Sequence, residues 1–219
     1  GNALSFDGLN VLSDTGDYVS LPPLGTSAPP FTIEAWVKPN GSQTQWASIV
    51  ASRLGSNIVS LSTGALEFCP GWVGFILCTT NNSSPGSAWQ HVAVVFLANS
   101  QKLFVNGALV KTFSNTITGH DLSAYQFNIG YDVDSGGDGS RTYKGLMDEL
   151  RIWSVDKSPD IANKSYRCSP LSGTTTGLVR YYKFDETTGT TASDSSGNSG
   201  NGTLKDGKMT LEMARLGLL

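Results

Sequence analysis

Three acidic residues lie within seven positions of one another in a glycine-rich segment past the middle of the chain. Asp132, Asp134 and Asp138 flank the pair Gly136-Gly137, and glycine lets the backbone adopt positive φ and fold side-chain oxygens inward. Carboxylates this close repel one another unless a cation or distance relieves them, and calcium prefers a shell of such oxygen ligands. The segment therefore predicts a calcium site, and a solvated acidic loop is the alternative.

The strand predicted directly after this segment carries a carboxylate among aliphatic residues. Successive side chains of a strand point to opposite faces, so one face carries Leu146, Asp148, Leu150 and Ile152. The opposite face carries Met147, Glu149, Arg151 and Trp153. Asp148 then needs hydrogen bonds from backbone amides or a metal ion, because a buried charge without a partner is costly.

Length and composition predict one large all-β domain. The chain has 219 residues, of which 39% are hydrophobic and 15% are charged, and 25 glycines separate many short apolar runs. Such a chain can bury a sizeable core, and this composition is typical of extracellular β-proteins. The net charge of -3, without a cluster of lysine or arginine, argues against nucleic acid as a partner.

Nothing in the sequence is long and apolar enough for a transmembrane segment, since no apolar run approaches the roughly 20 residues that span a bilayer. Gly1 leads directly into strand-like sequence with no signal peptide before it. We therefore expect a fragment of a longer secreted or cell-surface chain that carries neighbouring domains.

Short apolar or alternating runs bounded by turn residues predict most of the secondary structure. Strands are expected at 2–6, 17–21, 31–37, 48–51, 57–62, 65–69, 73–79, 89–96, 102–105, 108–113, 126–131, 146–153 and 177–184. One short helix is expected at Pro159–Tyr166, with Ser158 as its N-cap. Together these elements predict a two-sheet antiparallel β-sandwich with one short helix.

The stretch after residue 184, rich in glycine, serine and threonine, is open to two interpretations. It closes this domain by wrapping over a sandwich edge, or it is a flexible linker toward a following repeat. We expect the domain to comprise residues 1–204, with 177–204 as its closing strand and loop. Residues 205–219 then form a C-terminal tail.

Five blocks of sequence follow one another in a characteristic order. They are ALSFDG with GDYVSLP, FTIEAWVKP, AWQHVAVVF with KLFVNGALV, GLMDELRIWS, and GLVRYYKFDETTGTTASDSSGN. Together they resemble the laminin G-like domains of the concanavalin A-like lectin/glucanase superfamily, over nearly the whole chain up to about Leu204. The resemblance implies a concanavalin A-like jelly roll within a modular extracellular protein.

Within that superfamily, the segment that begins at Asp132 resembles the calcium loop of pentraxins. The resemblance implies that Asp132 and Asp134 supply acidic ligands and that Val133 supplies a backbone carbonyl. Ser56 or Asn57 would contribute oxygens from a partner loop. Pentraxins have an acidic residue and an amide in that loop, whereas the sequence LGSN has no carboxylate. The resemblance implies calcium-dependent ligand binding where this site is intact.

In such jelly rolls the N-terminal strand is commonly a neighbour of the strand that contains LMDELRIW. This arrangement predicts a second metal cluster of Asp7, Asp17 and Asp148, with Asp194 as a further possibility, in which a structural calcium joins strand ends. The alternative is that Asp148 caps backbone amides and that Asp7-Gly8 forms a turn.

Aromatic residues supply possible platforms for sugar rings. Most aromatic side chains in a sandwich belong to the core, so Trp89 and Trp153 are assigned to packing. Trp72, in the turn CPGWVG, and Tyr143, near the acidic loop, are expected to be exposed. The predicted ligand-binding residues are Tyr143, Asn57, Asp134 and Trp72.

The three cysteines have no metal-ligand spacing. Cys69 and Cys78 flank a predicted hairpin, so they form a disulfide if the register brings them opposite each other. Cys168 would then be free or paired outside the fragment, and three buried thiols are the alternative. Neither histidine has a companion that would support a zinc site or a catalytic triad.

The distribution of acids argues against a glycoside hydrolase. Retaining enzymes of this fold carry alternating acids on one strand face, with the carboxyls about 5 Å apart, and none of the five glutamates has such a companion. Asp148 and Glu149 are adjacent and should point to opposite faces of a strand.

We therefore expect a non-catalytic extracellular module that binds glycans or a protein partner with the help of calcium, within an adhesin-like multidomain protein. Two alternatives remain open. One is a structural spacer or protein-interaction module with structural calcium only, and the other is an accessory domain of a carbohydrate-active enzyme.

Overall fold

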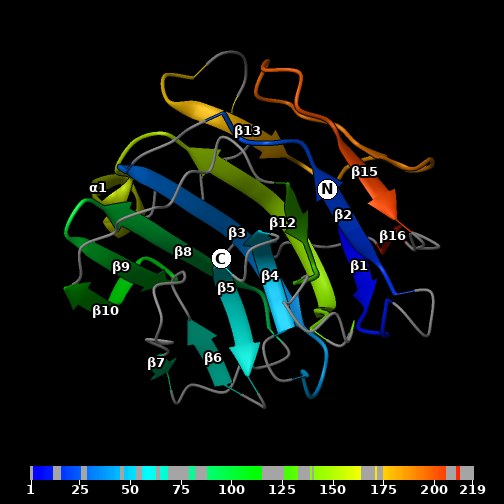
Figure 1. Ribbon diagram of the computed structural model, residues 1–219, viewed down its shortest axis with the longest axis horizontal. Helices are drawn as coiled ribbons and strands as arrows, with labels where there is room; N and C mark the ends of the chain where they lie inside the picture. The colour runs from blue at the N-terminus through cyan, green and yellow to red at the C-terminus, as the bar shows by residue number, and fades with distance from the viewer. Residues whose placement is uncertain are drawn as a thin grey trace.

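A computed structural model describes residues 2–11, 16–25, 29–44, 47–52, 56–62, 65–68, 79–81, 88–114, 126–132, 139, 141–163, 171, 175–205 and 211–212. For residues 52, 56–62, 65–68, 79–81 and 211–212 it describes the backbone alone. Two antiparallel sheets contain most of these residues, and a short helix lies beside them (Figure 1). The predicted all-β sandwich with one short helix is confirmed.

The first sheet has eight strands among the described residues and is built around β12. Its order is β10 (Ala108–Ser114), β9 (Ser100–Val105), β8 (Gln90–Leu97), β3 (Phe31–Pro39), β12 (Lys144–Trp153), β1 (Ala3–Asp7) and β16 (Leu211–Glu212). A further strand, β13 (Leu178–Tyr182), also pairs with β12. The N-terminal strand is therefore a direct neighbour of β12, as the resemblance predicted.

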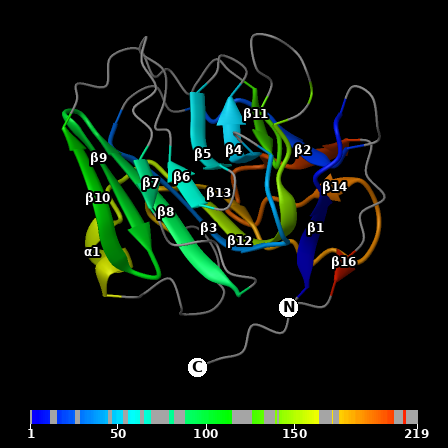
Figure 2. The same cartoon turned by 90° about the horizontal axis from the view of Figure 1, so that it is seen from below.

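The second sheet also has eight strands within the described ranges. Its order is β14 (Thr191–Ala192), β15 (Gly202–Lys205), β2 (Tyr18–Leu21), β11 (Phe127–Ile129), β4 (Ala47–Ser52), β5 (Ser56–Ser62), β6 (Ala65–Phe68) and β7 (Thr79–Asn81). Figure 2 shows the same strands from below. The strand predicted at 73–79 lies almost entirely outside the described residues.

The inward faces of both sheets contribute to one apolar core. Alternate residues of β3 enter it from the first sheet, namely Phe31, Ile33, Ala35 and Val37. Residues from the second sheet meet them, among them Val19, Ile49, Phe127 and Ile129. Successive side chains of a strand point to opposite faces, so burying one face of each sheet produces a sandwich whose apolar surface is removed from water.

A β-bulge in β12 changes which of its residues share a face. The register with β3 shifts between Asp148 and Arg151, and Glu149 has a φ of 52°, so β12 carries one extra residue at this point. Met147, Leu150 and Ile152 consequently face the core, whereas Leu146 packs with Ala3 in a separate cluster. The predicted common face of Leu146, Asp148, Leu150 and Ile152 is wrong, because strict alternation does not continue through an inserted residue.

Two strands pair with the same edge of β12, one after the other along its length. β1 pairs with the first half of β12, where Leu4 opposes Met147, and β13 pairs with the second half, where Tyr182 opposes Leu150. The bulge lies between the two paired stretches. Just beyond them, the backbone N–H of Asn2 donates to Asp185 Oδ1 at 3.0 Å, which joins the start of β1 to the segment that follows β13.

The helix α1 (Ser158–Ala162) begins one residue earlier than predicted. Lys157 occupies the N-cap position instead of Ser158, and the carboxylate of Asp156 accepts a hydrogen bond from the N–H of Ser158 at 2.7 Å. One of the free amides of the first turn is satisfied in this way. Ile161 packs against a patch of the first sheet, formed by Ala93, Val95 and Phe104. No helix in the described part of the chain is long and apolar enough to cross a membrane.

The stretch after residue 177 contributes strands to both sheets. β13 pairs with β12 in the first sheet, and β15 pairs with β2 in the second, so the chain passes from one sheet to the other (Figure 1). β13 and β15 are therefore strands of the two sheets of the sandwich.

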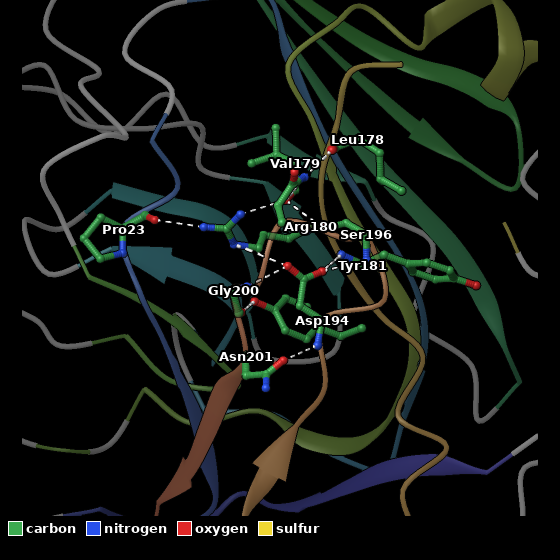
Figure 3. Close-up of polar contacts among 11 residues, drawn as sticks. Pro23, Leu178, Val179, Arg180, Tyr181, Asp194, Ser196, Gly200 and Asn201 are labelled. Atoms are coloured by element: carbon green, nitrogen blue, oxygen red, sulfur yellow. Dashed lines mark hydrogen bonds and ion pairs between the residues drawn. The ribbon is translucent and has the colours of Figure 1, made fainter. Parts of the chain in front are cut away.

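Asp194 organises the loop between β14 and β15 (Figure 3). Its carboxylate accepts hydrogen bonds from the backbone N–H groups of Tyr181 at 3.0 Å, Ser196 at 2.9 Å and Gly200 at 2.9 Å. Arg180 Nε lies 3.9 Å from Oδ2, and the Asp194 side chain is 0% exposed. This carboxylate therefore serves as an acceptor for backbone amides of a loop that would otherwise lack partners for them.

Replacing Asp194 by alanine is expected to lower the free energy of unfolding by about 3 kcal/mol, because three partly buried N–H groups lose a charged acceptor. Asp160→Ala is the matched control, since the side chain of Asp160 on α1 is 50% exposed, and its effect should stay within about 0.5 kcal/mol. Urea unfolding followed by tryptophan fluorescence measures both values. Equal losses in the two variants would contradict the role assigned to Asp194.

Candidate functional site

Acidic and aromatic side chains gather where β1 ends, β2 begins and β11 ends. We call this group the rim cluster, and it consists of Asp7, Asp17, Tyr18, Tyr131, Asp132 and Arg141. β11 pairs with β2 so that Ile129 opposes Val19, which places the residues after β11 beside those before β2. The ring centroids of Tyr18 and Tyr131 are 5.2 Å apart. Segments far apart in the sequence therefore meet at one end of the sandwich.

Two carboxyl groups of the rim cluster interact directly. Asp7 Oδ1 accepts hydrogen bonds from the backbone N–H of Leu9 at 2.9 Å and from that of Asp17 at 3.4 Å. Burial, together with repulsion from Asp7, raises the pKa of Asp17 to about 6. Asp17 Oδ1 is buried and has no hydrogen-bond partner among the described residues. The pair therefore has unused acceptor capacity at the start of β2.

Asp17 also lines a crevice between the two sheets. Leu4, Phe6 and Leu204 form apolar walls, and Tyr18 and Lys205 line it as well. The crevice has room for little more than one water-sized group, whereas pockets that enclose small molecules measure roughly 300–1,000 Å³. The crevice can therefore admit one substituent, such as a hydroxyl group, while the rest of a ligand stays on the surface.

Asp132 is bonded to an arginine that the sequence interpretation did not include. Arg141 Nη1 donates to Asp132 Oδ2 at 2.9 Å, and the backbone N–H of Asp132 donates to the carbonyl of Arg141 at 3.2 Å. Tyr131 and Thr142 form an antiparallel bridge, so Asp132 and Arg141 are the next pair along it. The sequence predicts strands at 126–131 and 146–153. A chain that reverses direction between them brings positions 132 and 141 together.

The remaining predicted calcium ligands of this loop fall outside the described side chains. Val133, Asp134 and Asp138 lie outside the described residues, as does the predicted ligand platform Trp72. Ser56 and Asn57 begin β5, where the structure describes only the backbone. The cysteines at 69, 78 and 168 also lie outside the described ranges. Among described residues, no group of three or more histidine, cysteine, aspartate or glutamate side chains could hold a metal ion.

Asp148 does not join Asp7 and Asp17, contrary to the prediction. Asp7 pairs with Lys144, and the rise of about 3.4 Å per residue along a strand places Asp148 about 14 Å further on. Asp148 is 3% exposed, and its Oδ1 accepts a hydrogen bond from the N–H of Glu149 at 2.8 Å. The structure thus shows the alternative, in which Asp148 binds a backbone amide.

The prediction that Tyr143 is exposed is wrong. Its side chain is 0% exposed and belongs to the main core, where its ring centroid lies 5.7 Å from that of Phe6. Its hydroxyl donates to the carbonyl of Leu146 at 3.0 Å, and burial raises the pKa of that hydroxyl. Tyr143 turns inward because it directly precedes β12, the central strand. The two tryptophans assigned to packing contact apolar neighbours, Trp153 in one cluster and Trp89 in another.

A buried polar network lies on the outer side of β3, β8 and β12, with Glu34 at its centre. His91 Nε2 lies 3.1 Å from Glu34 Oε2, and Trp153 Nε1 donates to Glu34 Oε1 at 3.0 Å. Arg151 Nη1 lies 3.8 Å from the same carboxylate. Burial alone would raise the pKa of Glu34, but the bond from His91 and the charge of Arg151 lower it. This network satisfies a buried charge, so these residues serve the fold.

The bulge also changes the argument against a hydrolase. Strict alternation of faces does not hold for Asp148 and Glu149, because the register shifts between Asp148 and Arg151 and Glu149 has a φ of 52°. The carboxylate of Glu149 accepts a hydrogen bond from the hydroxyl of Tyr181 at 2.5 Å and pairs with Arg151. Asp148 is nearly inaccessible and Glu149 is held by two partners, so their contacts point to a structural role for both acids.

A laminin G family model, described as the Concanavalin A-like lectin/glucanases superfamily, matches residues 13–161. This range contains β2 to β12 and most of α1. The chain belongs to this family. The resemblance drawn from the sequence blocks is confirmed, and β1 and β13 to β16, which lie outside the matched range, belong to the same two sheets.

Several solved structures have the fold of this laminin G-like chain. A candidate carbohydrate-binding protein from Bacteroides ovatus is 21% identical with a TM-score of 0.70, and the alignment covers 96% of this chain but 59% of that protein. The heptameric SAP-like pentraxin from Limulus polyphemus is 17% identical with a TM-score of 0.66, over 100% and 97% of the two chains. Domains LG4-5 of the mouse laminin alpha1 chain are 12% identical with a TM-score of 0.53, over 70% and 42%.

At these identities the likeness shows the fold alone. This chain spans less than two thirds of the Bacteroides protein, so it corresponds to a part of that molecule. Curated protein sequences give no match.

Asp148→Asn is expected to change how stability depends on pH. Burial, together with repulsion from Glu149, raises the pKa of Asp148 from 3.8 to about 7. The folded state then binds this proton more tightly than the unfolded state, so the stabilisation is complete below about pH 4 and is lost as the pH rises through 7. Between about pH 4 and 8, the wild-type protein should lose about 3 kcal/mol relative to the asparagine variant.

Unfolding free energies measured across this pH range in both proteins give the difference. His91, whose pKa burial lowers, contributes the opposite slope in both proteins and cancels. A difference that does not vary with pH would contradict the environment assigned to Asp148.

Proposed function

We propose that this laminin G-like domain is a non-catalytic binding module that recognises glycans at the rim cluster. The observation that carries the proposal is Asp17, whose Oδ1 is buried, lacks a hydrogen-bond partner among the described residues and adjoins the crevice next to Tyr18. A buried acceptor without a partner costs free energy. A sugar hydroxyl is a donor small enough to enter the crevice and remove that cost.

Recognition in this proposal uses three features of the rim cluster. A ligand hydroxyl donates to Asp17 Oδ1, the buried carboxylate oxygen whose pKa burial and repulsion from Asp7 raise to about 6. The sugar ring lies against the half-buried ring of Tyr18, which Tyr131 supports from 5.2 Å. Packing of the apolar face of the sugar ring against an aromatic side chain contributes affinity. The hydrogen bond from a hydroxyl to a carboxylate fixes the orientation of the sugar.

Three considerations support a binding role without catalysis. One relative of the same fold, the Bacteroides protein, is described as a candidate carbohydrate-binding protein. Asp148 and Glu149 are occupied by contacts within the protein. The crevice is too small to enclose a scissile bond between two sugars. A secreted or cell-surface location within an adhesin-like multidomain chain is part of the same proposal.

Calcium is proposed separately, for the loop that contains Asp134 and Asp138. The described part of the chain contains no complete set of ligands for it, and calcium takes six to eight oxygens. No step of the recognition described above depends on the metal.

Asp17→Asn is expected to weaken glycan binding at least about tenfold, because the amide is a poorer acceptor than a carboxylate and presents a donor in half of its orientations. The same change removes a charge that burial and Asp7 disfavour, so stability at pH 8 should rise by about 1 kcal/mol. Binding and stability thus move in opposite directions. A glycan array, followed by titration of the strongest sugar, measures the first, and urea unfolding measures the second.

Asp160→Asn is the matched control, since it makes the same chemical change on α1, far from β1 and β2 (Figure 1). It should leave array signals unchanged. An array that is silent for the wild-type protein in both calcium and EDTA would contradict glycan recognition and favour the spacer or protein-interaction alternative. Release of reducing sugars from polysaccharides by the purified chain would contradict the absence of catalysis.

A further inference from the structure

We infer that Arg141 is the permanent counter-ion of Asp132, so that this carboxylate is balanced by a guanidinium group where the sequence resemblance implied a calcium ion. The inference goes beyond the proposed function, because it concerns a different carboxylate from Asp17 and is measured without any sugar.

The first argument is the geometry of the pair. The side chain of Asp132 is 0% exposed, that of Arg141 is 27% exposed, and Nη1 lies 2.9 Å from Oδ2. This is the length of a charge-assisted hydrogen bond. A second bond joins the two backbones, from the N–H of Asp132 to the carbonyl of Arg141 at 3.2 Å. Two contacts of different kinds therefore fix one residue against the other.

The second argument is the position of the pair in the fold. The neighbouring bridge between Tyr131 and Thr142 connects the end of β11 to the start of β12, so Asp132 and Arg141 face each other at the base of the loop. The backbone N–H of Val11 also donates to the carbonyl of Gly139 at 3.1 Å. The loop base is therefore tied to the protein by direct contacts, and holding it in place does not require a metal.

The third argument is charge. A calcium ion bound to Asp132 would contact a carboxylate oxygen at about 2.3–2.6 Å, within a few ångströms of the guanidinium on Oδ2. Two cations so close repel each other strongly in a partly buried site.

The first experiment separates the counter-ion from a metal ligand. Melting temperatures of the full 219-residue chain are measured in millimolar calcium, in magnesium and in EDTA, for the wild-type protein and for Asp132→Asn. We expect the calcium-specific shift to be the same in both proteins, whether it is zero or arises from ligands elsewhere. A calcium-specific rise that is present in the wild type and lost in Asp132→Asn overturns the inference.

The second experiment measures the pairing itself in EDTA, with Asp132→Asn, Arg141→Gln and the double variant. Each single change leaves one charge without its partner, so we expect each melting temperature to fall by about 3–10 °C. The double variant should fall by clearly less than the sum of the two. If a single variant fails to fold while the double variant folds, the coupling is shown directly. Additive losses, or a double variant that does not fold, overturn the inference.

A glycan array that is silent leaves both of these measurements unaffected. Conversely, additive losses at Asp132 and Arg141 leave the proposed sugar contact at Asp17 intact, because Asp17 makes neither of the two contacts measured here. The failure of one proposal is therefore distinguishable from the failure of the other.

Discussion

The pairing of β12 on both of its edges is the constraint on which the rest of the structure depends. β3 follows it along one edge, and β1 and β13 divide the other, so segments near the two ends of the described chain are attached to one strand. The bulge at Glu149 lies between these two partners and turns Leu150 toward the core. Without the bulge, the second half of β12 would present its polar residues to the core and its apolar residues to the outer side of the sheet.

Burying so many acids requires a specific partner for each one, and the fold supplies three kinds. Backbone amides hold Asp194, a histidine, a tryptophan and an arginine hold Glu34, and an arginine pairs with Asp132. Each arrangement offsets the cost of removing a carboxylate from water. Asp17 differs because one of its oxygens has no partner among the described residues. This exception, at a crevice beside Tyr18, is what distinguishes the rim cluster from acids that serve the fold.

The architecture could be predicted from the sequence because it depends on local patterns. Alternating apolar residues, such as those of β3, and turn residues between them locate strands within a few positions, and the order of the blocks implies the laminin G-like topology. The predictions that failed concern side-chain direction. Tyr143 was placed on the surface because it lies near the acidic loop, and Asp148 was grouped with Asp7 because their strands are neighbours. Neighbouring strands are long enough to keep two residues about 14 Å apart.

The sequence by itself determined which segments become strands, that they pair as a sandwich and that one of these strands carries a carboxylate among apolar residues. Periodicity and composition encode these properties locally. Only the tertiary structure decided that Asp17 meets Asp7, that Arg141 meets Asp132 and that the bulge separates Leu146 from Leu150. These outcomes depend on strand register, and a shift of one residue reverses every side chain that follows. Register is set by packing across the whole sandwich, which no short stretch of sequence contains.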